Sequence, residues 1–223
     1  MSRLLPAPAH EVEAALSPWR RIVAGADAFF GRVFAAHKDS MRCGPGCTSC
    51  CHPDLTVLPS EALAILLGLG RLDPAPLRRL RRAGRADRCV LLGADELCSV
   101  YAERPLVCRS HGLPILQETE VGWCSLNFLD GAPPQSAVLD GNLLAAQLAV
   151  ADSLVYARGE SGPTARGVCL ARSDRTPGEA PRLARPRRVA IRDLLRLGAD
   201  ALPPLPPLPP PGHPGRVRTP VIR

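Results

Sequence analysis

Four cysteines lie within nine residues in the segment Cys43-Gly-Pro-Gly-Cys47-Thr-Ser-Cys50-Cys51. Packing alone gives no reason for such a cluster, whereas thiolates are soft ligands that favour zinc and iron–sulfur centres over magnesium or calcium. Gly44 and Gly46 allow unusual backbone angles, so the loop can fold around an ion and turn its amides towards sulfur. The segment therefore predicts a metal-binding loop.

Four further cysteines follow in segments with the pattern of ordered structure: Cys89, Cys98, Cys108 and Cys124. Four plus four thiols fit either two four-cysteine zinc sites or one cubane cluster with a second metal. Free cysteine is also a common buried residue, so any one of the downstream four can instead be a small apolar core residue.

An iron–sulfur cluster of the 4Fe-4S type is the favoured cofactor, and zinc is the alternative. The best three cluster ligands are then Cys43, Cys47 and Cys50, and the fourth is Cys51 or a downstream cysteine. The chain has nine cysteines, and Cys169 is left over because it lies in a polar segment far from the others.

Two arginines and a histidine follow the downstream cysteines closely in sequence. Arg104 and Arg109 beside an anionic thiolate cluster can neutralise its charge and tune its potential. Arg104 can equally cap the turn made by Pro105. His111 is expected beside the cluster as well, or as a ligand that replaces one cysteine.

Other side chains near the cysteines have simpler expected roles. His37 and His52 flank the first cluster and are weaker candidates for metal ligands. Tyr101 and Trp123 are expected to be core residues that shield the site from water.

Two cysteine motifs and a later cysteine carry a family resemblance. The motifs are Cys43-x3-Cys47-x2-Cys50-Cys51 and Cys98-Ser-Val-Tyr-Ala-Glu-Arg-Pro-Leu-Val-Cys108-Arg, followed by Cys124. Over about residues 37–130 the chain resembles the YkgJ-like cysteine-cluster family, also called CxxCxxCC, although Cys43 and Cys47 are one residue further apart than that name implies. The resemblance implies a protein that chelates zinc or iron, or that contains an iron–sulfur cluster.

Several helices must position these cysteines. Ser17 as N-cap and Pro18 as the first helical residue predict the start of a helix whose apolar residues recur on one face between residues 22 and 34. Shorter helices are expected at residues 59–69 and 73–86, and Asp140 is expected to cap a helix that runs to about residue 157. A last short helix at 189–197 can dock back on the core.

Between these helices the hydrophobic period changes to that of strands. Residues 89–101 predict a β-hairpin with a loop at 93–96, and residues 113–124 predict a second hairpin with a loop at 117–120. We therefore predict a small single α+β domain, mainly helical, with short β-hairpins around a cysteine-rich metal centre.

The chain changes character after this domain. Residues 1–157 are expected to form the metal-binding domain, and residues 158–223 a basic, Pro/Arg-rich and largely disordered tail. This tail holds 13 of the 28 basic residues and 5 of the 21 acidic ones, so the body is nearly neutral, and we do not expect nucleic-acid binding. The segment 203–211 favours polyproline II and can bind an unknown protein partner.

The compartment follows from what the sequence lacks. No apolar stretch reaches the roughly 18 to 20 residues that span a bilayer, and Glu11 and Glu13 stand where a signal peptide would be apolar. We expect a cytoplasmic protein without a membrane role. Thiols stay reduced there, which favours metal chemistry over disulfides.

Three functions stay open. The favoured one is a metal-centre protein with a structural, redox or sensing role and no activity of its own, since no catalytic dyad stands out. The second is an enzyme, because the Cys43–Cys47–Cys50 spacing is that of radical S-adenosylmethionine enzymes. However, the roughly 100 residues between this cluster and residue 157 cannot supply the repeated strand–helix units of their barrel. A flagellin lysine N-methylase also carries a similar cysteine motif, yet no Gly-rich cofactor loop is found. The third is a zinc-stapled interaction module.

Overall fold

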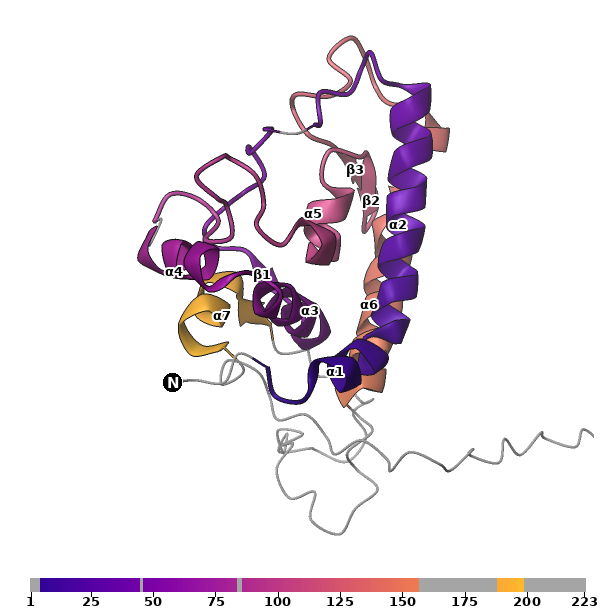
Figure 1. The fold of residues 1–223 in the computed structure, drawn as a ribbon. Coiled ribbons are helices and arrows are strands. Elements are labelled where there is room, and N and C mark those ends of the chain that lie inside the picture. The colour runs from indigo at the N-terminus through magenta and orange to yellow at the C-terminus, as the bar shows by residue number, and fades with distance from the viewer. Residues whose placement is uncertain (1–4, 45, 84–85, 157–187, 199–223) are drawn as a thin grey trace, which may run out of the picture.

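The structure is a computed structural model that describes residues 5–44, 46–83, 86–156 and 188–198 (Figure 1). The predicted tail, with Cys169 and the proline-rich segment 203–211, lies outside the described residues apart from 188–198. The domain boundary at residue 157 therefore stays a prediction.

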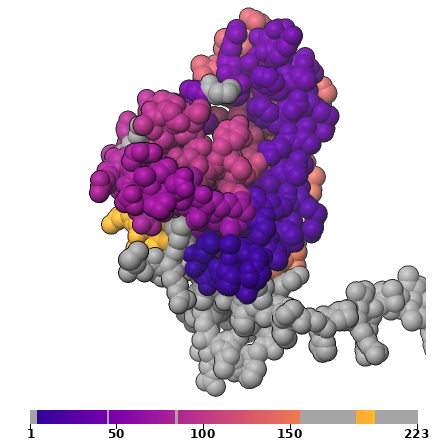
Figure 2. Space-filling model, viewed as in Figure 1, coloured from indigo at the N-terminus to yellow at the C-terminus, as the bar shows by residue number. Residues whose placement is uncertain are grey.

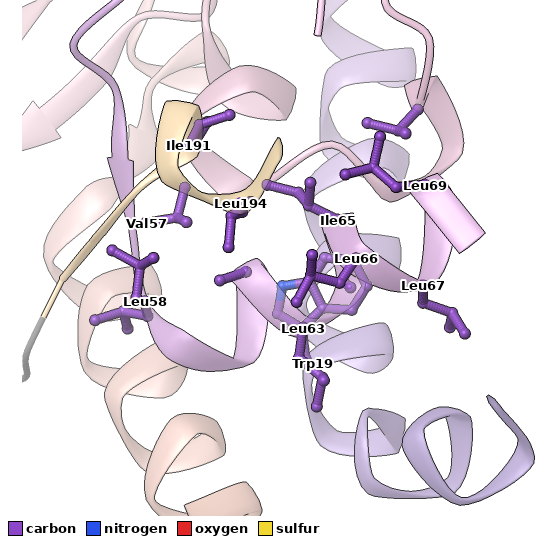
Figure 3. Packing of buried hydrophobic residues seen from close by; sticks show 14 of the residues in the cluster. Trp19, Val57, Leu58, Leu63, Ile65, Leu66, Leu67, Leu69, Ile191 and Leu194 are labelled. Atoms are coloured by element: carbon purple, nitrogen blue, oxygen red, sulfur yellow. The ribbon is translucent and has the colours of Figure 1, made fainter. Parts of the chain in front are cut away.

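The centre of the fold is helix α3, Pro59–Gly70, which is buried from Pro59 to Leu69. Its sequence PSEALAILLGLG is apolar on nearly every side, and a helix of that kind is stable only when neighbours cover it all round. Helices α1 (Ala9–Ala15), α6 (Gly141–Tyr156) and α7 (Ile191–Leu197) supply much of this cover. Figure 3 shows Trp19 beside Leu63 and Leu66 of α3.

The longest helix, α2, runs Ser17–Ala36 beside α6 along one side of the molecule (Figure 1). It begins one residue before Pro18, and Leu16 rather than Ser17 occupies its N-cap position without a side-chain bond. The prediction of Ser17 as N-cap was therefore wrong, although the proline does lie in the first turn. The last turn of α2 leads directly to the loop of the first four cysteines.

A short helix, α5 (Leu106–Ser110), packs against α2. The one-turn helix η1, Tyr101–Glu103, precedes α5 and lies against α3. On the face seen in Figure 2, the magenta surface of the segment from α4 (Pro74–Ala83) onwards lies beside the violet surface of α2. Residues distant in sequence are thereby brought close to the cysteine loop.

Two small sheets complete the fold of the described residues. Strand β1, Thr56–Val57, pairs antiparallel with β5, Val189–Ala190, and this pairing brings α7 onto the core. The helix expected at 189–197 is therefore present, but its first two residues form a strand. In the second sheet, β2 (Ile115–Gln117) lies between β3 (Glu120–Gly122) and the parallel β4 (Leu139–Asp140).

The two predicted hairpins differ in how far they form. Gln117 pairs with Glu120, so the second hairpin turns at residues 118–119 and its loop is shorter than predicted. The first hairpin has one isolated bridge, Leu92 with Cys98, within the described residues. The short one-turn helix η2, Gln135–Ala137, then leads to Asp140, which caps α6 as predicted by accepting the Leu143 N–H at 2.8 Å. The α+β, mainly helical class is thus confirmed.

Within the described residues, we find no helix with the length and apolar character needed to cross a membrane.

The buried carboxylate of Glu61 connects the central helix to α5. It accepts the Leu58 N–H at 3.1 Å at the start of α3 and the Leu106 N–H at 2.7 Å at the start of α5. Burial raises the pKa of this carboxyl, although the two N–H donors oppose that rise. Glu61 therefore fixes the position of the helix that carries Cys108.

We expect Glu61→Ala to lower the free energy of unfolding by about 2 to 5 kcal/mol, because two buried N–H donors lose their acceptor. Glu61→Gln keeps one carbonyl oxygen and should cost less. Urea unfolding of both variants tests this, with the exposed Glu120→Ala as the matched control. Equal stability of Glu61→Ala and Glu120→Ala would contradict the role of Glu61.

Candidate metal centre

The first four cysteines lie on a loop that follows α2 and is folded by local backbone bonds. The Cys47 N–H donates to the Gly44 carbonyl at 3.1 Å, and the Cys51 N–H donates to the Thr48 carbonyl at 2.9 Å. Gly46 has φ +84°, a conformation that glycine adopts readily and other residues rarely. The predicted need for glycine in this loop is therefore confirmed at Gly46.

The downstream cysteines reach the same region from three other segments. The Cys89 N–H donates to the Cys51 carbonyl at 2.8 Å, which places the first hairpin directly against the loop. Cys98 lies on that hairpin and Cys108 on α5. Cys124 follows β3 at the end of the second hairpin. Tertiary contacts thus gather cysteines that are up to 81 positions apart (124 − 43).

All eight cysteines line one cavity of about 190 Å³. They are free thiols, and seven of them are partly buried while Cys89 is buried. The cavity is large compared with the volume of about 30 Å³ that one water molecule occupies in the liquid. Cys43, Cys47, Cys50, Cys51, Cys89, Cys98, Cys108 and Cys124 are therefore one constellation in space.

The thiols are gathered but not yet arranged as ligands. Among the described residues, no group of three or more Cys, His, Asp and Glu side chains has the geometry to hold a metal ion. Because a fully formed metal site rarely exists without its metal, binding is expected to draw the thiols inwards from the cavity wall. The donor set of eight thiols in one cavity fits zinc or an iron–sulfur cluster.

Burial and mutual repulsion raise the pKa of several of these thiols. Burial raises the pKa of Cys50 to about 11, and the neighbouring Cys51 and Cys47 add to the rise. The pKa of Cys108 is raised further by burial, with Cys89 as the next cause. The positive charge of bound metal ions would lower these pKa values, because it favours the thiolate form.

Arg104 is the cation that faces the thiols. It lines the cavity, and its guanidinium lies 3.7 Å from the centroid of the Tyr101 ring. Its Nε is buried without a hydrogen-bond partner. Burial raises the pKa of Cys98, and the charge of Arg104 opposes that rise. A buried N–H donor without an acceptor fits a site that takes up anionic sulfur.

Arg109 also lines the cavity, but its polar atoms are engaged elsewhere. It is 8% exposed, pairs with Asp27 of α2, and donates to the carbonyls of Ala102 and Arg104, the latter at 2.7 Å. Burial lowers its pKa even though Asp27 favours the charged form. Its main visible effect is to hold α5 and the preceding turn against α2.

His111 lies in the cavity wall at the end of α5. Burial lowers its pKa, with a smaller contribution from His52, so the neutral ring that binds metals is favoured. The ring of His37 packs against that of Phe128, with 5.7 Å between the ring centroids.

The expectation that Tyr101 and Trp123 are core residues was wrong. Tyr101 is 63% exposed and Trp123 is 41% exposed. Tyr101 lies at the rim of the cavity, where its ring faces Arg104 rather than the core. Sequence reasoning assigned these aromatic residues to the core by type, but their placement depends on which side of the turn faces solvent.

Sequence analysis missed two residues that hold Cys43. Asn127 is 1% exposed, and its Nδ2 donates to the Cys43 sulfur at 3.3 Å and to the Gly112 carbonyl at 2.7 Å. Gly112 has φ +98°, and a methyl group at its Cα would overlap that sulfur. The sequence carries no signal for this arrangement, because the three residues meet only after the loops have folded.

Gly112→Ala should displace the Cys43 sulfur and strain the backbone, and so weaken metal binding. We expect at least a tenfold loss of zinc affinity, which competition with a chromophoric chelator would measure. Gly25→Ala in α2 is the matched control, because nothing lies within 4 Å of a methyl group there. Equal zinc affinity in the two variants would contradict this account of Gly112.

The raised thiol pKa values predict how stability depends on pH. In the unfolded chain, Cys50 ionises around its ordinary pKa of 9.0. In the folded protein its pKa is about 11, so it keeps its proton to higher pH. The unfolded state is then favoured, so the metal-free protein should lose stability as pH rises from 8 to 11. Urea unfolding with reductant measures this, and Cys50→Ala should show a shallower loss. An unchanged slope in that variant would contradict the prediction.

These features define a protein with a thiol-lined cavity whose donor set fits a metal centre. Residues 42–126, which include all eight cysteines of the cavity, match the model of the CxxCxxCC family, described as "Putative zinc- or iron-chelating domain". The match confirms the family resemblance for this part of the chain. No curated protein and no solved structure was found to match the chain.

Proposed function

We propose that this chain is a metal-binding protein that holds an iron–sulfur cluster through its clustered cysteines, with zinc as the alternative metal. The match of residues 42–126 supports binding of zinc or iron in general. The choice of an iron–sulfur cluster rests on the cavity itself.

One observation carries this choice: eight thiols share a single cavity of about 190 Å³. A lone tetrahedral zinc needs four ligands and closes its site around one atom. A 4Fe-4S cluster also takes four thiolates but fills a larger volume with its own sulfides. The shared volume and the surplus of thiols therefore favour a centre of several atoms, with room for a second metal beside it.

Charge and exposure support a redox or sensing role over a purely structural one. Arg104 offers one positive charge and an unpaired N–H to a centre that would be anionic. Leu97 and Tyr101, two residues of the cavity wall, are also exposed, so the centre lies near the surface. A bound cluster would supply one-electron chemistry, at a potential set by its hydrogen bonds and exposure.

Metal and sulfide analysis of protein purified without oxygen tests the proposal. We expect iron and acid-labile sulfide in matching amounts and a broad absorption band near about 400 nm. A colourless protein with about one or two zinc ions per chain would replace the cluster by zinc and make the site structural. Protein that takes up neither metal would overturn the proposal.

Cys47→Ser should remove metal and lower stability, because metal binding and folding are coupled in such domains. Cys169→Ser should change neither, since this cysteine lies outside the matched residues 42–126. Metal content and urea unfolding compare the two variants. Full metal content and stability in Cys47→Ser would show that the 43–51 cluster is not the metal site.

A further inference from the structure

The hydrogen bonds of one asparagine connect three segments of the candidate centre. The Asn127 Oδ1 accepts the Arg42 N–H at 2.7 Å, and its Nδ2 donates to Gly112 and to Cys43. The backbone N–H of Asn127 donates to the Cys124 carbonyl at 2.9 Å. The loop of Cys43, Gly112 and the segment of Cys124 are therefore connected through Asn127, which is 1% exposed.

The partners of Asn127 determine which way its amide points. Arg42 presents an N–H and needs an acceptor, while Gly112 presents a carbonyl and needs a donor. Only one orientation satisfies both, and it directs the Nδ2–H towards the Cys43 sulfur. The donor to this thiol is thus defined by the surrounding backbone.

The contact is also confined sterically. Gly112 leaves no room for a side chain beside the Cys43 sulfur, and a methyl group there would lie 3.2 Å from the Asn127 Nδ2. Phe128, the next residue, has φ +52°, which is uncommon for a bulky side chain, and its N–H donates to the Ser40 carbonyl at 2.7 Å. Such strain persists only where the surrounding structure holds it.

Cys43 differs from Cys89 and Cys98 in the source of its hydrogen bond, and its donor is buried, unlike the exposed contact of Cys47 with Ser49. Cys89 and Cys98 receive theirs from the backbone of Leu91 and Val100, which no substitution removes selectively. The bond to Cys43 comes from a side chain, one residue beyond the matched residues 42–126. The donor to Cys43 can therefore be removed by a single substitution, without changing the backbone.

We propose that Asn127 is a positioning residue of the metal centre, which orients the Cys43 sulfur through its Nδ2–H and withdraws electron density from it. The inference rests on the proposed function, because Cys43 must bind the metal for this bond to matter. Hydrogen bonds to ligating sulfur fix the ligand's direction and tune affinity and reduction potential. Asn127 acts on the metal through Cys43 and not as a ligand itself.

The test compares Asn127→Ser and Asn127→Asp with the same changes at Asn142, the other asparagine of the chain. Asn142 is a matched control because it also bonds a backbone N–H and carbonyl, those of Glu118 at 2.8 and 3.0 Å, but lies exposed and outside the cavity wall. The serine variant removes the donor without adding charge. The aspartate variant keeps the acceptor for Arg42 and replaces only the donor.

Metal-free proteins are titrated with Co²⁺, whose thiolate charge-transfer band reports on the sulfur. Both Asn127 variants should bind Co²⁺ about 10- to 100-fold more weakly, with the band moved to lower energy because the sulfur is more electron-rich. Both Asn142 variants should match the wild type. If the wild type holds an iron–sulfur cluster, the same loss should lower its reduction potential.

A second measurement separates positioning from a purely structural role. In a Cys43→Ser background, Asn127→Ser should cost no further Co²⁺ affinity, since the sulfur on which it acts is gone. An equal cost in both backgrounds would overturn the proposal, as would a wild-type band and affinity in both Asn127 variants. Wild-type protein that binds no zinc, iron or cobalt would instead refute the proposed function, and this inference with it.

Discussion

Helix α3 is apolar on nearly every side, and its need for cover determines the arrangement of its neighbours. Helices α1, α6 and α7 pack around it, and α7 reaches it through the pairing of β1 with β5. Two buried carboxylates in this region accept backbone donors: Glu61 accepts two N–H groups, and Asp152 accepts the Ser60 N–H at 2.8 Å. The cysteine-bearing segments pack against these helices, since η1 contacts α3 and Glu61 binds the start of α5.

The cysteine side of the molecule is organised differently. Its segments have little regular pairing, and they are connected instead by single contacts between loops, such as the Cys89 N–H with the Cys51 carbonyl. Arg109 joins α5 to α2 through Asp27, and Asn127 joins the loop of Cys43 to that of Cys124. A region joined through contacts between loops gains more from a bound metal than an apolar core would, because the metal adds connections between segments.

The pKa values of the thiols also bear on the binding of a metal in the cavity. Burial raises the pKa of Cys50, Cys51 and Cys108, and neighbouring thiols around the cavity add to each rise. Hydrogen bonds such as that from Asn127 to Cys43 offset part of the cost of ionising these thiols, and positive charge within or beside the cavity offsets more. Arg104 supplies one such charge with an unpaired Nε, and a metal centre would supply the rest.

The sequence by itself determined the chemistry and most of the helices. Thiol spacing in 43–51 identified the family motif, and apolar periodicity with Asp140 as a cap located α6, because both signals lie within a few neighbouring residues. Only the tertiary structure decided that all eight thiols share one cavity, that Tyr101 and Trp123 are exposed, and that Asn127 and Gly112 confine Cys43. These features arise from contacts between residues tens of positions apart, and local patterns carry no information about which distant segments will meet.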